Sequence, residues 1–194
     1  MLWMIAASGL VAALSYFLTG ATLKFLQRRA ILDHPNERSS HAVPIPRGGG
    51  IPVVALIIPL WLIPFETEQS SSIGIILVGA IALAVISWLD DLKPRSPAIR
   101  LAVQLMAVGL GVYSFSTEQP LFGDVLPRWL EFGIVGIGWL WFVNLFNFMD
   151  GIDGISSAQT IAICLGLIGI GLILEKAPVP IWYPAALCAA FAGF

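Results

Sequence analysis

The stretch LEFGIVGIGWLWFVNLFNFMDGIDG, residues 130–154, decides the fold that this sequence can adopt. Its apolar part, residues 130–148, has about the length that an α-helix needs to cross a bilayer. Four polar residues then recur at every third position, so neighbours in the series share a helix face: Asn144, Asn147, Asp150 and Asp153. Gly151 and Gly154 predict that the helix ends near Asp150. The stretch therefore predicts a membrane helix that emerges into a polar cluster.

Such polar groups at the edge of a membrane are costly and usually face a protein interior or a watery cavity, which favours a functional role. The alternative is an ordinary helix end followed by a turn, because Asn and Asp-Gly are common turn residues. Two Asp-Gly pairs after two asparagines favour function over this alternative.

The rest of the chain repeats the apolar pattern. Hydrophobic residues make up 58% of the sequence and charged residues only 11%, whereas soluble domains are nearer half and a quarter. Seven apolar runs approach spanning length: 2–23, 48–65, 73–89, 99–115, 130–148, 157–174 and 181–194. We therefore expect an all-α, polytopic membrane protein with about seven transmembrane helices in one domain over residues 1–194. The net charge of −2 gives no reason to expect nucleic acid as a partner.

The distribution of positive charge predicts the orientation. Eight of the ten Lys and Arg residues lie within residues 24–47 or 93–100. The positive-inside rule then places the N-terminus outside the cell. It also makes three loops cytoplasmic: 24–47, 90–98 and 149–156. The last run, 181–194, is short for a span, so we expect the chain to be truncated at its C-terminal end.

A second polar motif, WLDDLKPR at residues 88–95, ends the third apolar run. Carboxylates are not preferred at a helix C-terminus, and the adjacent charges of Asp90 and Asp91 repel each other. Both become favourable if a divalent cation binds there, because Mg²⁺ takes one or two carboxylates together with substrate phosphate oxygens. The alternative is a solvated loop beside a span.

The first cytoplasmic loop holds the first motif in chain order, DHPNERSSHAVPIPRGGG at residues 33–50, so that WLDDLKPR is the second motif and NLFNFMDGIDG the third. Arg38, His41 and Arg47 are available to bind anions. The three glycines at 48–50 allow close backbone approach and open the second span, where free N–H groups favour phosphate. Taken alone, this motif is better explained as a flexible basic loop that obeys the positive-inside rule.

Together the three loops gather carboxylates, amides and cations on one membrane face. Carboxylates alone repel phosphate, but a bound metal reverses that effect. Lys93 and the arginines can neutralise the remaining phosphate oxygens. The mixture suits a metal-bridged pyrophosphate.

These motifs, DHPNERSSH…PRGGG, WLDDL and NLFNFMDGIDG in this order, resemble the polyprenyl-phosphate N-acetylhexosamine-1-phosphate transferases of glycosyltransferase family 4. The likeness runs from the first span to about residue 160 and is nearest to the O-antigen-initiating branch. It implies transfer of a sugar-1-phosphate from a UDP-N-acetylhexosamine to undecaprenyl phosphate, with release of UMP. Mg²⁺ is the implied cofactor, with Mn²⁺ as an alternative, and the bacterial inner membrane is the implied location. The resemblance leaves open whether the protein forms a homodimer.

The resemblance also implies residue roles. The lipid phosphate and the metal would lie at Asp90 and Asp91, and the uracil beside Asp153. The implied catalytic residues are Asp90, Asp91, Asp150 and Asp153, and the implied metal ligands are Asp90, Asn147 and Asp150. The substrate-binding residues are Asn144, Asn147, Gly151, Ile152, Arg38, His41, Arg47 and Lys93.

One departure from the family matters. Its members have about ten spans and two later cytoplasmic motifs, which this sequence lacks. An inactive or incomplete fragment of such an enzyme is therefore one alternative. A small transporter that relays ions through its aspartates is another, although transporters place such groups near the midplane of the bilayer.

Overall fold

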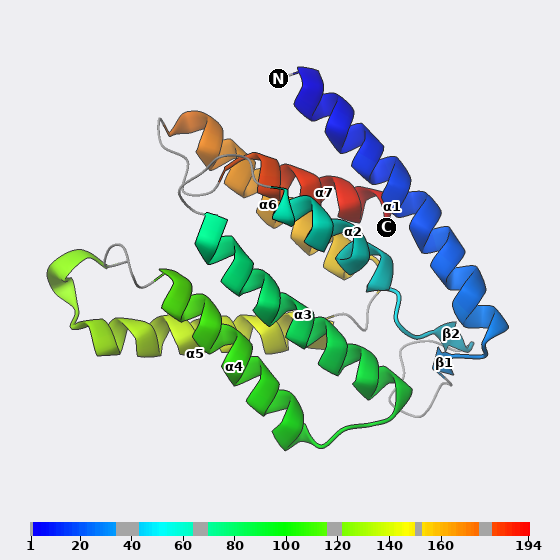
Figure 1. The fold of residues 1–194 in the computed structure, drawn as a ribbon, viewed down its shortest axis with the longest axis horizontal. Helices are drawn as coiled ribbons and strands as arrows, with labels where there is room; N and C mark the ends of the chain where they lie inside the picture. The colour runs from blue at the N-terminus through cyan, green and yellow to red at the C-terminus, as the bar shows by residue number, and fades with distance from the viewer. Residues whose placement is uncertain (1, 34–42, 64–69, 116–121, 150–152, 175–179) are drawn as a thin grey trace. The chain divides into compact units, whose positions relative to one another are not determined.

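The computed structural model describes residues 2–33, 43–63, 70–115, 122–149, 153–174 and 180–194. These residues form seven α-helices, a two-stranded ribbon and a short 3-10 helix, η1 (Gly123–Val125) (Figure 1). The helices are α1 (Leu2–Arg28), α2 (Ile51–Leu62), α3 (Ser70–Leu92), α4 (Pro97–Phe115), α5 (Arg128–Met149), α6 (Ile155–Ile173) and α7 (Trp182–Gly193). The all-α, polytopic fold expected from the sequence is confirmed, with one helix in each of the seven apolar runs.

The helices differ in whether they can cross a membrane. By length and composition, α1, α3, α4, α5 and α6 are apolar and long enough to span. The other two, α2 and α7, have 12 residues each and are therefore about 18 Å long, against a hydrocarbon core of about 30 Å. Within the described residues, five of the seven predicted spans therefore have a helix of spanning length, and two have a shorter one.

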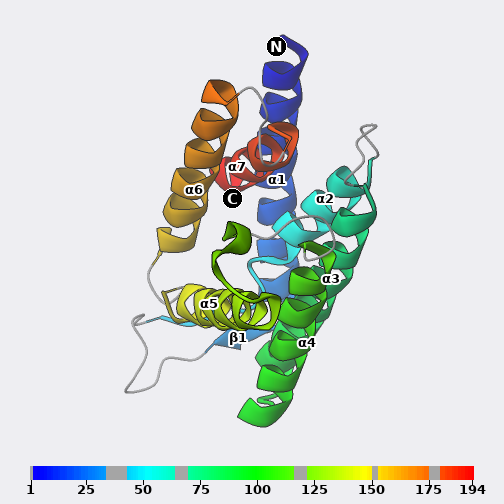
Figure 2. The ribbon, with the colours of Figure 1, turned by 90° about the vertical axis from the view of Figure 1, so that its left-hand side faces the viewer.

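The chain divides into two compact units, Met1–Ile63 with Met149–Phe194, and Pro64–Phe148. In the first unit α7 packs against α1, α2 and α6, and Figure 2 shows it lying between α1 and α6. Small residues allow this close packing, since Ala186, Ala189 and Ala190 are buried. A buried hydrogen bond joins two of these helices, because the Ser15 hydroxyl donates to the Ala190 carbonyl at 2.6 Å.

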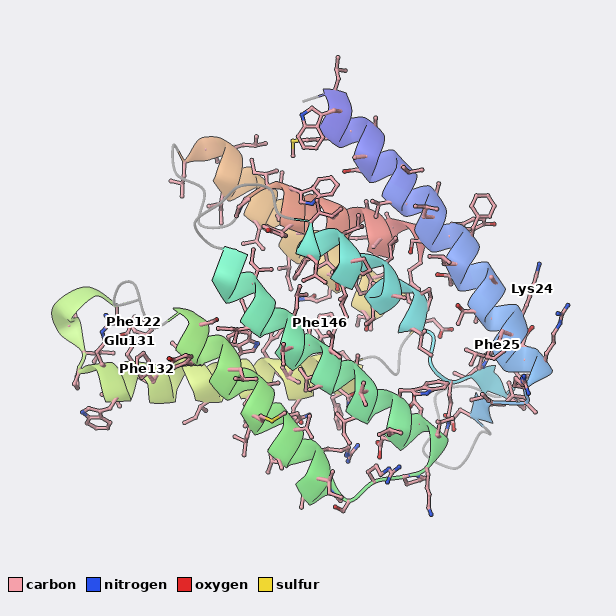
Figure 3. The ribbon with its side chains drawn as sticks, in the orientation of Figure 1. Lys24, Phe25, Phe122, Glu131, Phe132 and Phe146 are labelled. Atoms are coloured by element: carbon pink, nitrogen blue, oxygen red, sulfur yellow. The ribbon has the colours of Figure 1, made fainter. Side chains whose placement is uncertain are left out.

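A short antiparallel ribbon follows α1 in the first unit. It pairs β1 (Leu32–Asp33) with β2 (Ile45–Pro46). The Arg47 Nε donates to Asp33 Oδ1 at 3.2 Å, and its Nη2 contacts the same oxygen. Arg28 is the last residue of α1, Arg29 follows in the turn, and Lys24 projects from the last turns of the helix (Figure 3). Among the described residues of the first loop, Arg47 thus binds the ribbon directly.

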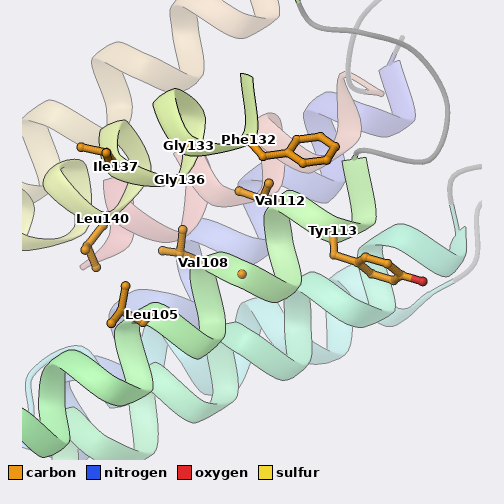
Figure 4. Close-up of a pocket in the computed structure, with 10 residues that line it drawn as sticks. Leu105, Val108, Val112, Tyr113, Phe132, Gly133, Gly136, Ile137 and Leu140 are labelled. Atoms are coloured by element: carbon orange, nitrogen blue, oxygen red, sulfur yellow. The ribbon is translucent and has the colours of Figure 1, made fainter. Parts of the chain in front are cut away.

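In the second unit α3 and α4 form an antiparallel pair joined by residues 93–96. Gly79 permits their close approach, because a Cβ at this position would lie 3.2 Å from the Ala107 carbonyl oxygen. At Gly111 a Cβ would collide with the Trp139 ring of α5. An open pocket of about 400 Å³ lies between α4 and α5 (Figure 4). Its lining is almost wholly apolar and includes Leu105, Val108, Phe132 and Leu140.

The turn before α5 is fixed by a buried carboxylate. Glu131, in the first turn of α5, is only 1% exposed. Its Oε1 accepts the backbone N–H of Phe122 at 3.1 Å, and Figure 3 shows Phe122 beside Glu131. A helix N-terminus favours negative charge, which helps to explain an acidic residue at this position.

Candidate functional site

In the second unit, both carboxylate oxygens of Asp90 accept hydrogen bonds. Asp90 lies in the last turn of α3. Its Oδ1 accepts the backbone N–H of Arg95 at 2.6 Å, and its Oδ2 accepts Arg100 Nη1 at 3.0 Å. The carboxylate therefore ties the end of α3 to the following turn and to the start of α4. An ionised carboxylate has about four acceptor sites, so Asp90 can still bind a further ligand.

One turn beyond Arg100, α4 also contacts the third-motif helix. Gln104 follows Arg100 by four residues, so the two side chains share a face of α4. The Asn144 Nδ2 on α5 donates to Gln104 Oε1 at 3.1 Å and to the Leu140 carbonyl at 2.8 Å. These two bonds use both amide hydrogens of Asn144, which leaves Oδ1 as its ligand atom. A single face of α4 thus connects the second motif with the third.

Three more predicted site residues belong to the same unit. Asp91 lies beside Asp90 in α3, and Lys93 follows the helix end, where its backbone N–H donates to the Leu89 carbonyl at 3.0 Å. Asn147 lies three residues beyond Asn144 on α5 and is exposed. Two contacts therefore link these segments: Asp90 with Arg100 joins the end of α3 to α4, and Asn144 with Gln104 joins α5 to α4.

The third motif ends its helix as predicted, since α5 stops at Met149 and α6 starts at Ile155. Asp153 lies exposed in the turn between them, in the first unit. Gly154 has a φ of 75°, a left-handed conformation that glycine adopts without strain. The predictions for Asp150, Gly151 and Ile152 lie outside the described residues.

The first-loop motif is only partly described. Arg38 and His41 lie outside the described residues, so their predicted role stays a prediction. Arg47 is described, and its guanidinium is bound to Asp33. The glycines precede a helix as predicted: α2 starts at Ile51, and its first N–H donates to the Gly48 carbonyl at 3.2 Å. Arg47 therefore has a structural contact in addition to the anion-binding role predicted for it.

Sequence reasoning did not assign Arg100 or Gln104 to the site. Both lie inside the apolar run 99–115, where Arg100 is explained as a charge that flanks a span and Gln104 as an isolated polar residue. Their spacing of four residues was the available signal, because polar residues at this spacing mark one face of a helix.

The ligand atoms that the aspartates and asparagines of the site offer are of the type that magnesium binds. Asp90, Asp91, Asn144 and Asn147 offer only oxygen atoms as ligands, and hard cations such as Mg²⁺ prefer oxygen. Within the described ranges, no group of three or more His, Cys, Asp or Glu side chains is arranged to hold a metal. Mg²⁺ usually takes only one or two protein carboxylates and completes its shell with water and substrate phosphate, so these residues fit it.

Comparison with known proteins places the chain among membrane transferases. The model of glycosyl transferase family 4 matches residues 73–194. The undecaprenyl-phosphate alpha-N-acetylglucosaminyl 1-phosphate transferase of Thermotoga maritima is 31% identical over 147 residues, which cover 75% of this chain and 45% of that protein. The decaprenyl-phosphate N-acetylglucosaminephosphotransferase of Mycobacterium leprae is 28% identical over 202 residues, covering 94% and 50%.

A third relative, the Escherichia coli K12 undecaprenyl-phosphate alpha-N-acetylglucosaminyl 1-phosphate transferase, is 31% identical over 160 residues, covering 78% of this chain and 41% of that protein. The chain thus spans about half the length of these relatives. No solved structure matches it significantly.

Proposed function

The chain belongs to glycosyl transferase family 4, and from this premise we propose that it carries the N-terminal part of a polyprenyl-phosphate sugar-1-phosphate transferase. The proposed donor is a UDP-N-acetylhexosamine and the proposed acceptor is undecaprenyl phosphate, as the names of the relatives suggest. The product is a lipid-diphosphate sugar that starts a bacterial surface polysaccharide. Lipopolysaccharide biosynthesis is the pathway that the sequence motifs favour.

The observation that carries this proposal is that Asp90 and Asn144 each bind a side chain on the same face of α4, Arg100 and Gln104 respectively, one turn apart. The two residues come from different motifs, more than 50 positions apart in the sequence. A transferase needs such an assembly at the membrane edge, where a lipid phosphate and a soluble nucleotide can both reach it. A transporter instead needs its ionisable groups near the midplane.

The proposed reaction is an in-line displacement at phosphorus. An oxygen of the lipid phosphate attacks the phosphorus that bears the sugar, a new P–O bond forms, and the bond to the UMP oxygen breaks. The electron pair of that bond leaves with UMP. Because the second pKa of a phosphate monoester is about 6, the attacking group is largely ionised at neutral pH and needs no strong base.

The residues of this chain then act mainly by position and charge, as is usual in phosphoryl transfer. Asp90 and Asp91 would hold a magnesium ion, which would supply charge neutralisation at the phosphates. Asn144 and Asn147 would orient phosphate or metal from the side of α5. Lys93 would neutralise phosphate charge. Asp153 would contact the nucleotide base.

We propose the orientation that the positive charges favour, with the N-terminus outside and these loops in the cytoplasm of a bacterial inner membrane. UDP-sugars are charged and water-soluble, so an active site on this side meets its donor directly. The family relationship supports a multi-pass protein of this kind.

The test is a transfer assay in membranes with Mg²⁺, labelled UDP-N-acetylglucosamine and undecaprenyl phosphate. Two samples are compared: residues 1–194 alone, and the open reading frame that contains them. Labelled lipid together with equimolar UMP from the reading frame supports the proposal. If that sample forms no labelled lipid with any UDP-N-acetylhexosamine, the proposal fails. Product from the reading frame but not from residues 1–194 assigns the activity to a longer protein.

A further inference from the structure

We propose that Arg100 and Gln104 are positioning residues, which hold Asp90 and Asn144 so that their oxygen atoms present a fixed ligand pair. This inference rests on the proposed function and adds two residues to its site. Neither residue belongs to the motifs that carry the family resemblance.

The contact at Arg100 fixes the plane of a carboxylate. One oxygen of Asp90 is held by the backbone N–H of Arg95 and the other by the Arg100 guanidinium. Two contacts on different oxygens remove the rotation that a carboxylate at a helix end would otherwise have. The second acceptor site of each oxygen then points in a defined direction.

The contact at Gln104 fixes an amide in the same way. Its Oε1 takes one hydrogen of the Asn144 amide, while the Leu140 carbonyl takes the other. A side-chain amide can present either a donor or an acceptor toward a ligand. Both amide hydrogens of Asn144 are thus bound, one by α4 and one by α5. The amide oxygen, which is the atom suited to a cation, is then the atom that Asn144 presents to a ligand.

The two contacts lie on one rigid element. Arg100 and Gln104 are separated by one helical turn, about 6 Å along the axis. The face of α4 therefore sets the spacing between a group of the second motif and a group of the third. Residues that orient ligands in this way typically change metal affinity or activity by about 10- to 100-fold when mutated.

The sign of the effect on metal binding separates positioning from charge. If Arg100 acted only as a nearby positive charge, Arg100→Gln would make a divalent cation bind more tightly. If Arg100 positions Asp90, the same change weakens binding. We expect the Mn²⁺ concentration for half-saturation, followed by the loss of the free-ion EPR signal, to rise about 10-fold.

Arg95→Gln is the matched control, because it removes an equal charge from the same turn while the backbone N–H of residue 95 remains. Its half-saturation should stay within about 2-fold of wild type or fall. Arg100→Lys keeps the charge and one donor and should recover most of the affinity. Tighter or unchanged Mn²⁺ binding in Arg100→Gln would overturn the proposal for Arg100. If Arg100→Gln does not fold, as judged by its thermal melt, a roughly 10-fold loss of Mn²⁺ affinity in the Arg95→Gln control would overturn it, because removal of the charge alone would then account for the weakening.

The Gln104 contact is tested by steady-state kinetics of sugar-phosphate transfer, measured on the protein that the whole open reading frame encodes. Gln104→Leu should lower kcat at least 10-fold with a smaller change in KM for the UDP-sugar. Gln104→Glu keeps an acceptor oxygen and should stay within about 3-fold. In an Asn144→Ala background, Gln104→Leu should add less than 2-fold, because the two residues act together. Full additivity of these two changes would refute the role of Gln104.

The outcomes also distinguish this inference from the proposed function. If the wild-type protein transfers no sugar phosphate, the proposed function fails, but the Mn²⁺ titration of the Arg100 variants still decides whether Asp90 is held for a cation. If transfer is robust and the titration shows no weakening, the function stands and the positioning role falls.

Discussion

Ser15 and Ala190, 175 residues apart in the sequence, are joined by a 2.6 Å hydrogen bond that is fully enclosed by protein. The hydroxyl of Ser15 donates to the carbonyl of Ala190, so α1 and α7 approach closely enough for a side chain of one to contact the backbone of the other. We predict that Ser15→Ala lowers the free energy of unfolding by about 1 kcal/mol, which is typical of a hydrogen bond between membrane helices. Denaturation by SDS in mixed micelles measures this change. Ser8→Ala on the same helix is the control, and an equal loss there would contradict the assignment.

The approach of α4 to α5 gives a sharper test, because α4 contains two glycines in different surroundings. A Cβ at Gly111 would enter the Trp139 ring, whereas at Gly109 nothing lies within 4 Å. We predict that Gly111→Ala destabilises the protein by about 1–3 kcal/mol through overpacking. Gly109→Ala should be neutral or slightly stabilising, since alanine is the better helix former. Equal melting temperatures for the two variants would show that the two helices do not pack at Gly111.

The buried carboxylate of Glu131 should contribute more to the free energy of unfolding than a surface charge does. Glu131→Ala leaves the Phe122 N–H without its acceptor, and we expect a loss of about 1–3 kcal/mol of stability. Glu131→Gln retains an acceptor oxygen and should lose clearly less. Thermal melts of the purified protein in detergent compare the two. A Glu131→Gln variant as unstable as Glu131→Ala would show that the negative charge, not the hydrogen bond, holds the turn.

For the proposed reaction, we predict that Asp90→Asn and Asp153→Asn each lower transfer by roughly 100-fold or more while the protein still inserts and folds. Loss of a carboxylate weakens the metal or nucleotide site without changing side-chain volume. Labelled-lipid formation in the active reading frame measures the effect. Glu131→Gln, a carboxylate change away from the proposed site, is the control and should keep near-normal transfer. Near-normal turnover in both aspartate variants would refute the site assignment.

Much of the fold was predictable from the sequence because the bilayer allows few solutions. Runs of apolar residues near spanning length, separated by polar breaks, leave helices as the satisfied backbone structure in lipid. The end of α5 near Asp150 followed from two Asp-Gly pairs, and the structure ends that helix at Met149. The end of α2 at Leu62 was not predictable, because a hydropathy pattern does not show where a helix gives way to a turn.

The candidate site was predictable in its residue types but not in its contacts. Asp90 and Asn144 stood out because polar residues at the edge of a span are costly. Their connection through Arg100 and Gln104 depends on how α3, α4 and α5 pack, and no local pattern encodes that packing. Arg47 shows the opposite case: a basic residue predicted to meet an anion is bound to Asp33, a carboxylate 14 positions earlier.

The burial of α7 has a consequence for how the first unit assembles. Half of its residues are buried, against α1, α2 and α6. The long helices can enter the bilayer one at a time on their own hydrophobicity. We therefore expect α7 to gain its place late, by docking onto neighbours that are already inserted, so that side-chain volume in α7 matters more than its hydropathy.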